Sequence, residues 1–211
     1  MVKKEWKDLK IVVAGAGTGG LSTCRVLFNF NPKYIILPKN GGIINDGRPE
    51  LNPKVGKMAN LSNKYKLKGN LTEAIKNANI FIGLSTSNVL TIKMVKSMAK
   101  DAIVFALANP DPEIMTEDAF AGGVRIVATG RPEFPNHINN ELVFPGLFRI
   151  QRSFDGKSFK YCWRYESRRA SRALTSLVSS RELNEKFVIP DVFDKRCAKV
   201  ITDSLKNILF F

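Results

Sequence analysis

One stretch decides the fold of this chain: Ile11-Val12-Val13-Ala14-Gly15-Ala16-Gly17-Thr18-Gly19-Gly20. An apolar, β-branched run enters a glycine-rich turn, and residues 21–28 leave it with apolar side chains at helical spacing. The G-x-G-x-x-G spacing in a strand–turn–helix context is typical of a dinucleotide site, because backbone amides and a helix N-terminus can hold a pyrophosphate there. A tight turn without a ligand is the alternative. The expected cofactor contacts are Gly15, Ala16, Gly17, Thr18, Gly19 and Gly20.

The rest of the chain alternates short apolar runs with helical patterns. Strands are predicted at residues 11–14, 34–37, 80–84, 103–108 and 124–128. Helices are predicted at 21–30, at 71–77 with Asn70 as the N-cap, at 91–100 and 112–121, again from about Ala170, and last after Asp194, which is expected to cap it. Residues 41–66 read as mostly loop with room for one short helix. This order predicts an α/β fold, a Rossmann-type doubly wound parallel sheet with helices on both faces and a C-terminal helical extension.

Three parts are expected along the chain. Residues 1–149 form the dinucleotide-binding domain, residues 150–169 are an atypical basic segment, and residues 170–211 form a helical segment that packs on the same domain. A length of 211 residues with 44% hydrophobic residues suffices for one large domain.

The loops after the strands are the candidate site, since ligands of such sheets bind at the carboxyl ends of the strands. Ser85 follows the third strand and is expected to line the cofactor cleft, although a plain loop serine is the alternative. Lys39 follows the second strand, where an acid would hold the free ribose of NAD. Its positive charge favours the 2′-phosphate of NADP slightly, and NAD stays open.

Two asparagines are candidates for the other end of the cleft. Asn109 follows the fourth strand, and Asn140 precedes an apolar run. Amide side chains suit a carboxylate or a nicotinamide carboxamide, and loop capping is the alternative for each. The acids Asp111, Glu113, Glu117 and Asp118 are interpreted as partners of a helix dipole rather than metal ligands.

Composition narrows the class of protein. The three cysteines are far apart, and the single histidine, His137, has no second His or Cys nearby, so a reduced, cytoplasmic setting without a metal site is expected. No apolar run is long enough to span a membrane. The net charge is +14, and residues 149–172 carry eight basic and two acidic residues. Interleaved aromatic residues make nucleic-acid binding by this segment a weak alternative.

Several motifs in order resemble the cofactor domain of bacterial and archaeal malic enzymes. They cover residues 8–149 and resume near Ala170. The quoted motifs are Gly15-Ala16-Gly17-Thr18-Gly19-Gly20, Gly47-Arg48-Pro49-Glu50-Leu51-Asn52-Pro53, Phe105-Ala106-Leu107-Ala108-Asn109-Pro110, Ile126-Val127-Ala128-Thr129-Gly130-Arg131, Phe134-Pro135-Asn136, Asn139-Asn140 through Phe144-Pro145-Gly146, Glu182-Leu183-Asn184-Glu185 and Ile189-Pro190-Asp191-Val192-Phe193-Asp194.

The resemblance implies an oxidoreductase that oxidises malate with NAD or NADP and decarboxylates the product to pyruvate with Mg²⁺ or Mn²⁺. It assigns Asn109 and Asn140 to the substrate side and the glycine turn to the cofactor. The family's catalytic Tyr and Lys and its acidic metal ligands belong to an N-terminal half, so no catalytic or metal residue is expected here. The resemblance further implies a homo-oligomer in the complete enzyme and an inactive isolated chain.

The chain departs from the family at two places. The family has an acid where Lys39 stands, and residues 150–169 resemble nothing in it. Two compensating reading-frame shifts or real divergence would each explain the second departure. Alternative functions are a non-catalytic dinucleotide-binding module and the cofactor domain of another amino- or hydroxy-acid dehydrogenase.

Overall fold

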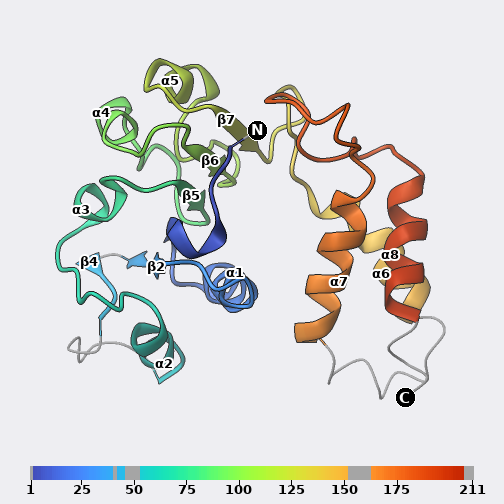
Figure 1. Cartoon of the computed structure of the whole chain (residues 1–211), viewed down its shortest axis with the longest axis horizontal. Coiled ribbons are helices and arrows are strands. Elements are labelled where there is room, and N and C mark those ends of the chain that lie inside the picture. Colours follow the sequence, from blue (N-terminus) through green and yellow to red (C-terminus); the bar gives the residue numbers. More distant parts are fainter. Residues whose placement is uncertain (1, 40–41, 46–52, 152–162, 207–211) are drawn as a thin grey trace. The chain divides into compact units, whose positions relative to one another are not determined.

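The computed structural model describes residues 2–39, 42–45, 53–151 and 163–206. By their contacts these residues form two compact units, one of Val2–Gly130 and one that begins at Arg131 (Figure 1). None of the described helices is long and apolar enough to cross a lipid bilayer.

A parallel sheet forms the centre of the first unit. Its strands, in the order β2-β1-β5-β6-β7 across the sheet, all pair in parallel. The predicted strands are confirmed, most of them somewhat shorter or shifted by a residue or two. Their bounds are β1 Lys10–Ala14, β2 Tyr34–Ile36, β5 Ile80–Gly83, β6 Ile103–Ala106 and β7 Ile126–Thr129.

Helices cover both faces of this sheet, as predicted. Side chains alternate along β1: Val12 belongs to one apolar cluster and Val13 to the other. On the Val12 side lie α3 (Leu71–Ile75), α4 (Ile92–Lys96) and α5 (Thr116–Ala121). On the Val13 side lie α1 (Thr18–Phe28) and α2 (Pro53–Leu61). A short 3₁₀ turn, η1 (Trp6–Asp8), precedes the sheet.

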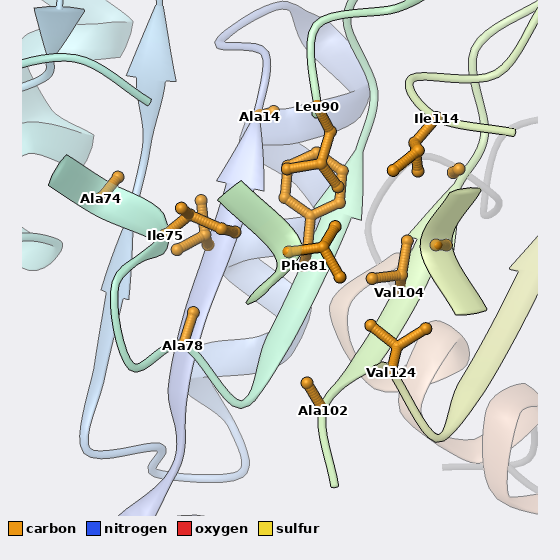
Figure 2. Close-up of a cluster of buried hydrophobic side chains, with 14 of the residues drawn as sticks. Ala14, Ala74, Ile75, Ala78, Phe81, Leu90, Ala102, Val104, Ile114 and Val124 are labelled. Atoms are coloured by element: carbon orange, nitrogen blue, oxygen red, sulfur yellow. The ribbon is translucent and has the colours of Figure 1, made fainter. Parts of the chain in front are cut away.

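The cluster on the Val12 side is centred on Phe81 of β5, which is fully buried (Figure 2). Leu90 and Val104 pack in the same cluster, from the loop after β5 and from β6. Burying a phenylalanine of this size stabilises a fold by about 2–3 kcal/mol. This cluster therefore holds the ends of β5 and β6 in a fixed place.

Two predictions for the first unit were wrong in detail. A short antiparallel pair, β3 (Pro38–Lys39) and β4 (Gly42–Ile43), lies in a region that was expected to be loop from residue 41. The helix expected from Pro112 begins only at Thr116. The carbonyls of Pro112 and Glu113 accept hydrogen bonds from the loop after β5 and so are not used for a helical turn.

The second unit is helical. Its elements are η2 (Asn140–Leu142), α6 (Phe144–Gln151), α7 (Trp163–Thr175) and α8 (Arg196–Lys206). Leu142, Ile150, Leu174 and Ile201 are buried in its core. Asp194 accepts a hydrogen bond from the backbone N–H of Arg196 at 2.9 Å, which confirms the predicted cap of the last helix.

The helix expected near Ala170 begins seven residues earlier, at Trp163. Its buried Ala170 and Leu174 lie four residues apart and pack in the core with α8, which provides the apolar partner that an isolated basic helix lacks. The basic segment 150–169 thus ends inside α7, and its residues 152–162 lie outside the described residues. The expected packing of residues 170–211 on the dinucleotide domain stays a prediction.

Candidate dinucleotide-binding site

A cavity of about 540 Å³ lies outside the carboxyl ends of β1 and β5. From β1 the chain passes to β2 on one side, and from β5 it passes to β6 on the other. Such a switch point is where open parallel sheets bind ligands. Among the described residues, the cavity is lined by Ala14, Gly15, Ala16, Gly17, Pro38, Lys39, Gly42, Asn70, Leu71, Leu84, Ser85, Thr86 and Val89.

The glycine turn is closed tightly against its surroundings at two positions. Gly15 has φ of +107°, and a Cβ there would lie 2.3 Å from the carbonyl oxygen of Leu84. A Cβ on Gly20 would lie 1.8 Å from the carbonyl oxygen of Gly15. Only glycine fits at these two positions. Because neither residue has a side chain, the turn can approach the loop after β5 and the start of α1 closely.

Between these two glycines the turn is open. A Cβ on Gly17 or on Gly19 would meet nothing within 4 Å. Gly17 is the N-cap of α1, and no side chain caps the helix there. The first amides of α1 have no partner within the helix and are suited to an anion. This bare cradle fits the pyrophosphate of a dinucleotide.

The loop after β5 forms the opposite wall of the cavity. The backbone N–H of Leu84 donates to the carbonyl of Ala14 at 2.9 Å, which joins this loop to the end of β1. Next to it, the backbone N–H of Ser85 donates to Oε1 of Glu113 at 3.1 Å. Glu113 is fully buried, lies before the start of α5, and uses both carboxylate oxygens on backbone N–H groups of loops, so its interpretation as a helix-dipole partner was wrong. Glu117 and Asp118 do lie in the first turn of α5.

The structure brings together five of the predicted cofactor residues. Gly15, Ala16, Gly17, Lys39 and Ser85 all line the cavity, with Lys39 exposed on β3. Among the described lining residues there is no Thr18, Gly19 or Gly20. Thr18 and Gly19 are exposed at the start of α1, and Gly20 is buried. Contact of each residue with a cofactor stays a prediction.

The two candidate substrate residues lie in different units. Asn109 is exposed after β6, joined to Pro110 by a cis peptide bond, and is absent from the described lining of the cavity. Asn140 is exposed at the first position of η2, where the side chain of Asn139 accepts a hydrogen bond from the backbone N–H of Glu141. A shared substrate site for these two asparagines stays a prediction.

Sequence reasoning missed the part of the wall that α3 supplies. Asn70 was predicted as an N-cap, and its Oδ1 does accept a hydrogen bond from the backbone N–H of Thr72 at 2.7 Å. The cap and the following Leu71 also line the cavity, together with Val89. The sequence signals the cap but not the direction in which the helix end faces. In the described part of the chain no three His, Cys, Asp or Glu residues group as metal ligands.

Comparisons with known proteins agree with this geometry. A family model described as "Malic enzyme, NAD binding domain" matches residues 1–202. The chain is 39% identical over 207 residues to the bifunctional malic/malolactic enzyme of Bacillus subtilis, covering 96% of this chain and 49% of that protein. It is 39% identical over 158 residues to the NADP-dependent malic enzyme of Haemophilus influenzae, covering 71% of this chain and 20% of that protein.

A solved structure has the same fold. The crystal structure of the NAD-dependent malic enzyme from Thermotoga maritima matches with a TM-score of 0.85 and 33% identity, over 96% of this chain and 52% of that one. The chain thus spans about half the length of the Bacillus relative and of this solved structure. The alternative of a different amino- or hydroxy-acid dehydrogenase is set aside by these matches. The chain belongs to the malic enzyme family and corresponds to that family's NAD-binding domain.

Proposed function

We propose that this chain binds NAD or NADP in the cavity between the glycine turn, Lys39 and Ser85, as the cofactor half of an enzyme that oxidises and decarboxylates malate. The observation that carries the proposal is the meeting of these residues in one cavity at the switch point of the sheet. The open backbone at Gly17 supports a pyrophosphate there, since no side chain fills the cradle.

The choice between the two cofactors rests on Lys39. Relatives include an NAD-dependent and an NADP-dependent malic enzyme, so the family alone leaves both open. Lys39 lines the cavity with its charge and favours the 2′-phosphate of NADP slightly. When bound, the nicotinamide would supply the acceptor for the hydride that leaves the substrate, and this chain's part would be to hold and orient it.

The malate side of the reaction belongs to the same proposal. Asn109 and Asn140 would bind the substrate through their amide groups, which donate and accept without a net charge. The other half of the enzyme would supply the catalytic residues and the ligands of Mg²⁺ or Mn²⁺, and it would take part in the release of pyruvate. The complete enzyme would be a homo-oligomer. The proposal places this reaction in the cytoplasm.

Titration of the purified chain with NADH and NADPH, followed by fluorescence, tests the proposal. We expect saturable binding of both and weaker binding after Gly17→Ala. Gly17 has extended backbone (φ −77°, ψ −172°) and free space at Cβ, so alanine changes the free energy of unfolding by less than about 0.5 kcal/mol. A methyl group in the cradle should nonetheless weaken binding about tenfold or more.

Gly56→Ala is the matched control. Gly56 lies in α2, a Cβ there also meets nothing within 4 Å, and it is absent from the described lining of the cavity. Binding should be unchanged in this variant. If neither reduced cofactor binds the folded chain, or if both glycine variants bind like the wild type, the proposed site is wrong.

A further inference from the structure

A buried acid joins the loop after β5, which lines the candidate site, to the loop after β6. Glu113 has 0% of its surface exposed, although it follows Asp111 and Pro112 in a polar stretch. Its Oε1 accepts the backbone N–H of Ser85 at 3.1 Å, and its Oε2 accepts the backbone N–H of Ala108 at 3.0 Å. One carboxyl group therefore holds the loop after β5 and the loop after β6.

The backbone around Glu113 adds to this link. The N–H of Leu90 donates to the carbonyl of Glu113 at 2.9 Å, and the N–H of Asn88 donates to the carbonyl of Pro112 at 3.1 Å. The hydroxyl of Ser87 donates to the carbonyl of Asp111 at 2.8 Å. These bonds join the two loops at three further points.

The strand end beneath Ser85 is shaped around the same carboxyl group. A Cβ on Gly83 would lie 2.2 Å from the carboxyl carbon of Glu113. The backbone N–H of the next residue, Leu84, donates a hydrogen bond to the carbonyl of Ala14. The carbonyl of Leu84 in turn leaves no room for a side chain on Gly15. A continuous set of contacts therefore runs from Glu113 through residues 83–85 to the glycine turn.

The chemistry of the side chain explains why an acid is needed. A carboxylate offers two acceptor oxygens and no donor, which suits two backbone N–H groups that approach from different loops. Glutamine would accept one of them and turn an NH₂ group toward the other. A buried N–H without an acceptor is costly, so the loop would shift to find one.

We propose that Glu113 is a positioning residue for cofactor binding: it fixes Ser85 in the cavity wall, and Ala108 next to Asn109, at one set distance from the glycine turn. The inference rests on the proposed function. Because Ser85 lines the cavity while Glu113 itself is buried below it, Glu113 acts through the backbone and not by touching the cofactor.

Glu113→Gln tests this inference in the full chain. Measured at a temperature at which the variant is fully folded, the dissociation constants for NADH and NADPH should rise about tenfold. Ile126→Ala is the control, because Ile126 is buried at the first position of β7, at the end of the strand away from these loops, and its truncation costs stability. Its dissociation constants should stay within about twofold of the wild type.

Amide hydrogen exchange tests the hydrogen bonds from Ser85 and Ala108 to Glu113 without a cofactor. In Glu113→Ala, the amides of Ser85 and Ala108 should exchange at least about tenfold faster, while amides in the middle of β5 and β6 keep their protection. Gly83→Ala, which pushes the carboxyl group away, should produce the same pair of changes and weaker cofactor binding. This variant decides the matter if Glu113→Gln does not fold.

The outcomes separate the two proposals. If the wild-type chain binds NADH or NADPH, and Glu113→Gln and Gly83→Ala bind it as tightly as the wild type, the positioning role is wrong and the proposed function stands. If the two amides exchange no faster when the carboxyl group is removed, the link itself is wrong. If the wild-type chain binds neither cofactor, the proposed function fails, and the positioning role with it.

Discussion

At the scale of single residues, we propose that Lys39 biases the choice of cofactor in the proposed site toward NADP. It is exposed and lines the cavity beside the glycine turn. Lys39→Asp should move the ratio of NADPH to NADH affinity toward NADH by about three- to tenfold, since solvent and salt weaken an exposed charge pair. Fluorescence titration with both cofactors at two salt concentrations measures the ratio.

A second lysine controls for the change in net charge. Lys93 in α4 is exposed and absent from the described lining of the cavity. Lys93→Asp changes the net charge equally and should leave the ratio unchanged. A wild-type chain that prefers NADH, or a ratio that moves equally in both variants, contradicts the role given to Lys39.

The reactivity of the Cys24 thiol reports on how tightly α1 packs against the sheet, because Cys24 is buried on that helix. Burial on α1 raises the pKa of Cys24 to about 12. Burial likewise raises the pKa of Cys197. An unfolded thiol ionises near pH 8.5, so at that pH the native chain holds far less reactive thiolate. The raised native pKa also means that this group's contribution to stability is present below about pH 9 and is lost as the pH rises toward 12.

We therefore expect slow labelling of these two thiols. In a Cys162→Ser chain at pH 8.5, a thiol reagent should modify Cys24 about a thousandfold more slowly in the native state than in guanidinium. Mass spectrometry of the labelled peptides separates Cys24 from Cys197. Rapid native labelling at Cys24 would mean that α1 does not cover the sheet as described.

At the scale of elements, α3 links stability to the cofactor site. Asn70 and Glu73 form a capping box, in which the N–H of Asn70 donates to Glu73 at 2.8 Å. Asn70→Ala should lower the free energy of unfolding by about 1 kcal/mol. It should also weaken NADH binding several-fold, because Asn70 and Leu71 line the cavity. Urea denaturation and fluorescence titration measure the two effects.

The cap of α4 is a matched control for this prediction. Thr91 accepts a hydrogen bond from the backbone N–H of Met94 at 3.2 Å and is absent from the described lining of the cavity. Thr91→Ala should cost a similar amount of stability and leave binding unchanged. Equal binding losses in the two variants would show that binding follows stability alone.

The elements also show how far local sequence patterns reach. The strand–turn–helix of residues 10–28 is predictable because its signals are all local: apolar run, glycine spacing and helical periodicity. The β3–β4 pair is too short to leave a pattern, since each strand has two residues. The start of α5 at Thr116 depends on bonds from a loop more than 20 residues away.

The candidate site follows the same rule. Gly15, Lys39 and Ser85 could be predicted to meet because each follows a strand of one parallel sheet, and such strands end at one edge. Glu113 could not, since the sequence places it among exposed acids and only the fold buries it. Asn70 was predicted as a cap, but whether it faces the cavity depends on tertiary packing.

At the scale of the whole molecule, the chain spans about half the length of the Bacillus subtilis relative. Malic enzymes, by the resemblance, take their catalytic Tyr and Lys and their metal ligands from an N-terminal half. The purified 211-residue chain should therefore bind NADH or NADPH yet show no malate-dependent reduction of NAD or NADP with Mn²⁺.

Adding the other half in trans completes this prediction. The part of the Bacillus subtilis enzyme that lies outside the matched region, produced separately, should give malate-dependent reduction only when this chain is present, because the cofactor and the catalytic residues then come from different chains. Gly17→Ala should lower that activity in step with its loss of cofactor binding. Activity of the 211-residue chain alone would contradict the proposal that this chain binds the cofactor and the other half supplies the catalytic residues. Binding of the cofactor without any activity in the mixture would instead favour a non-catalytic dinucleotide-binding module.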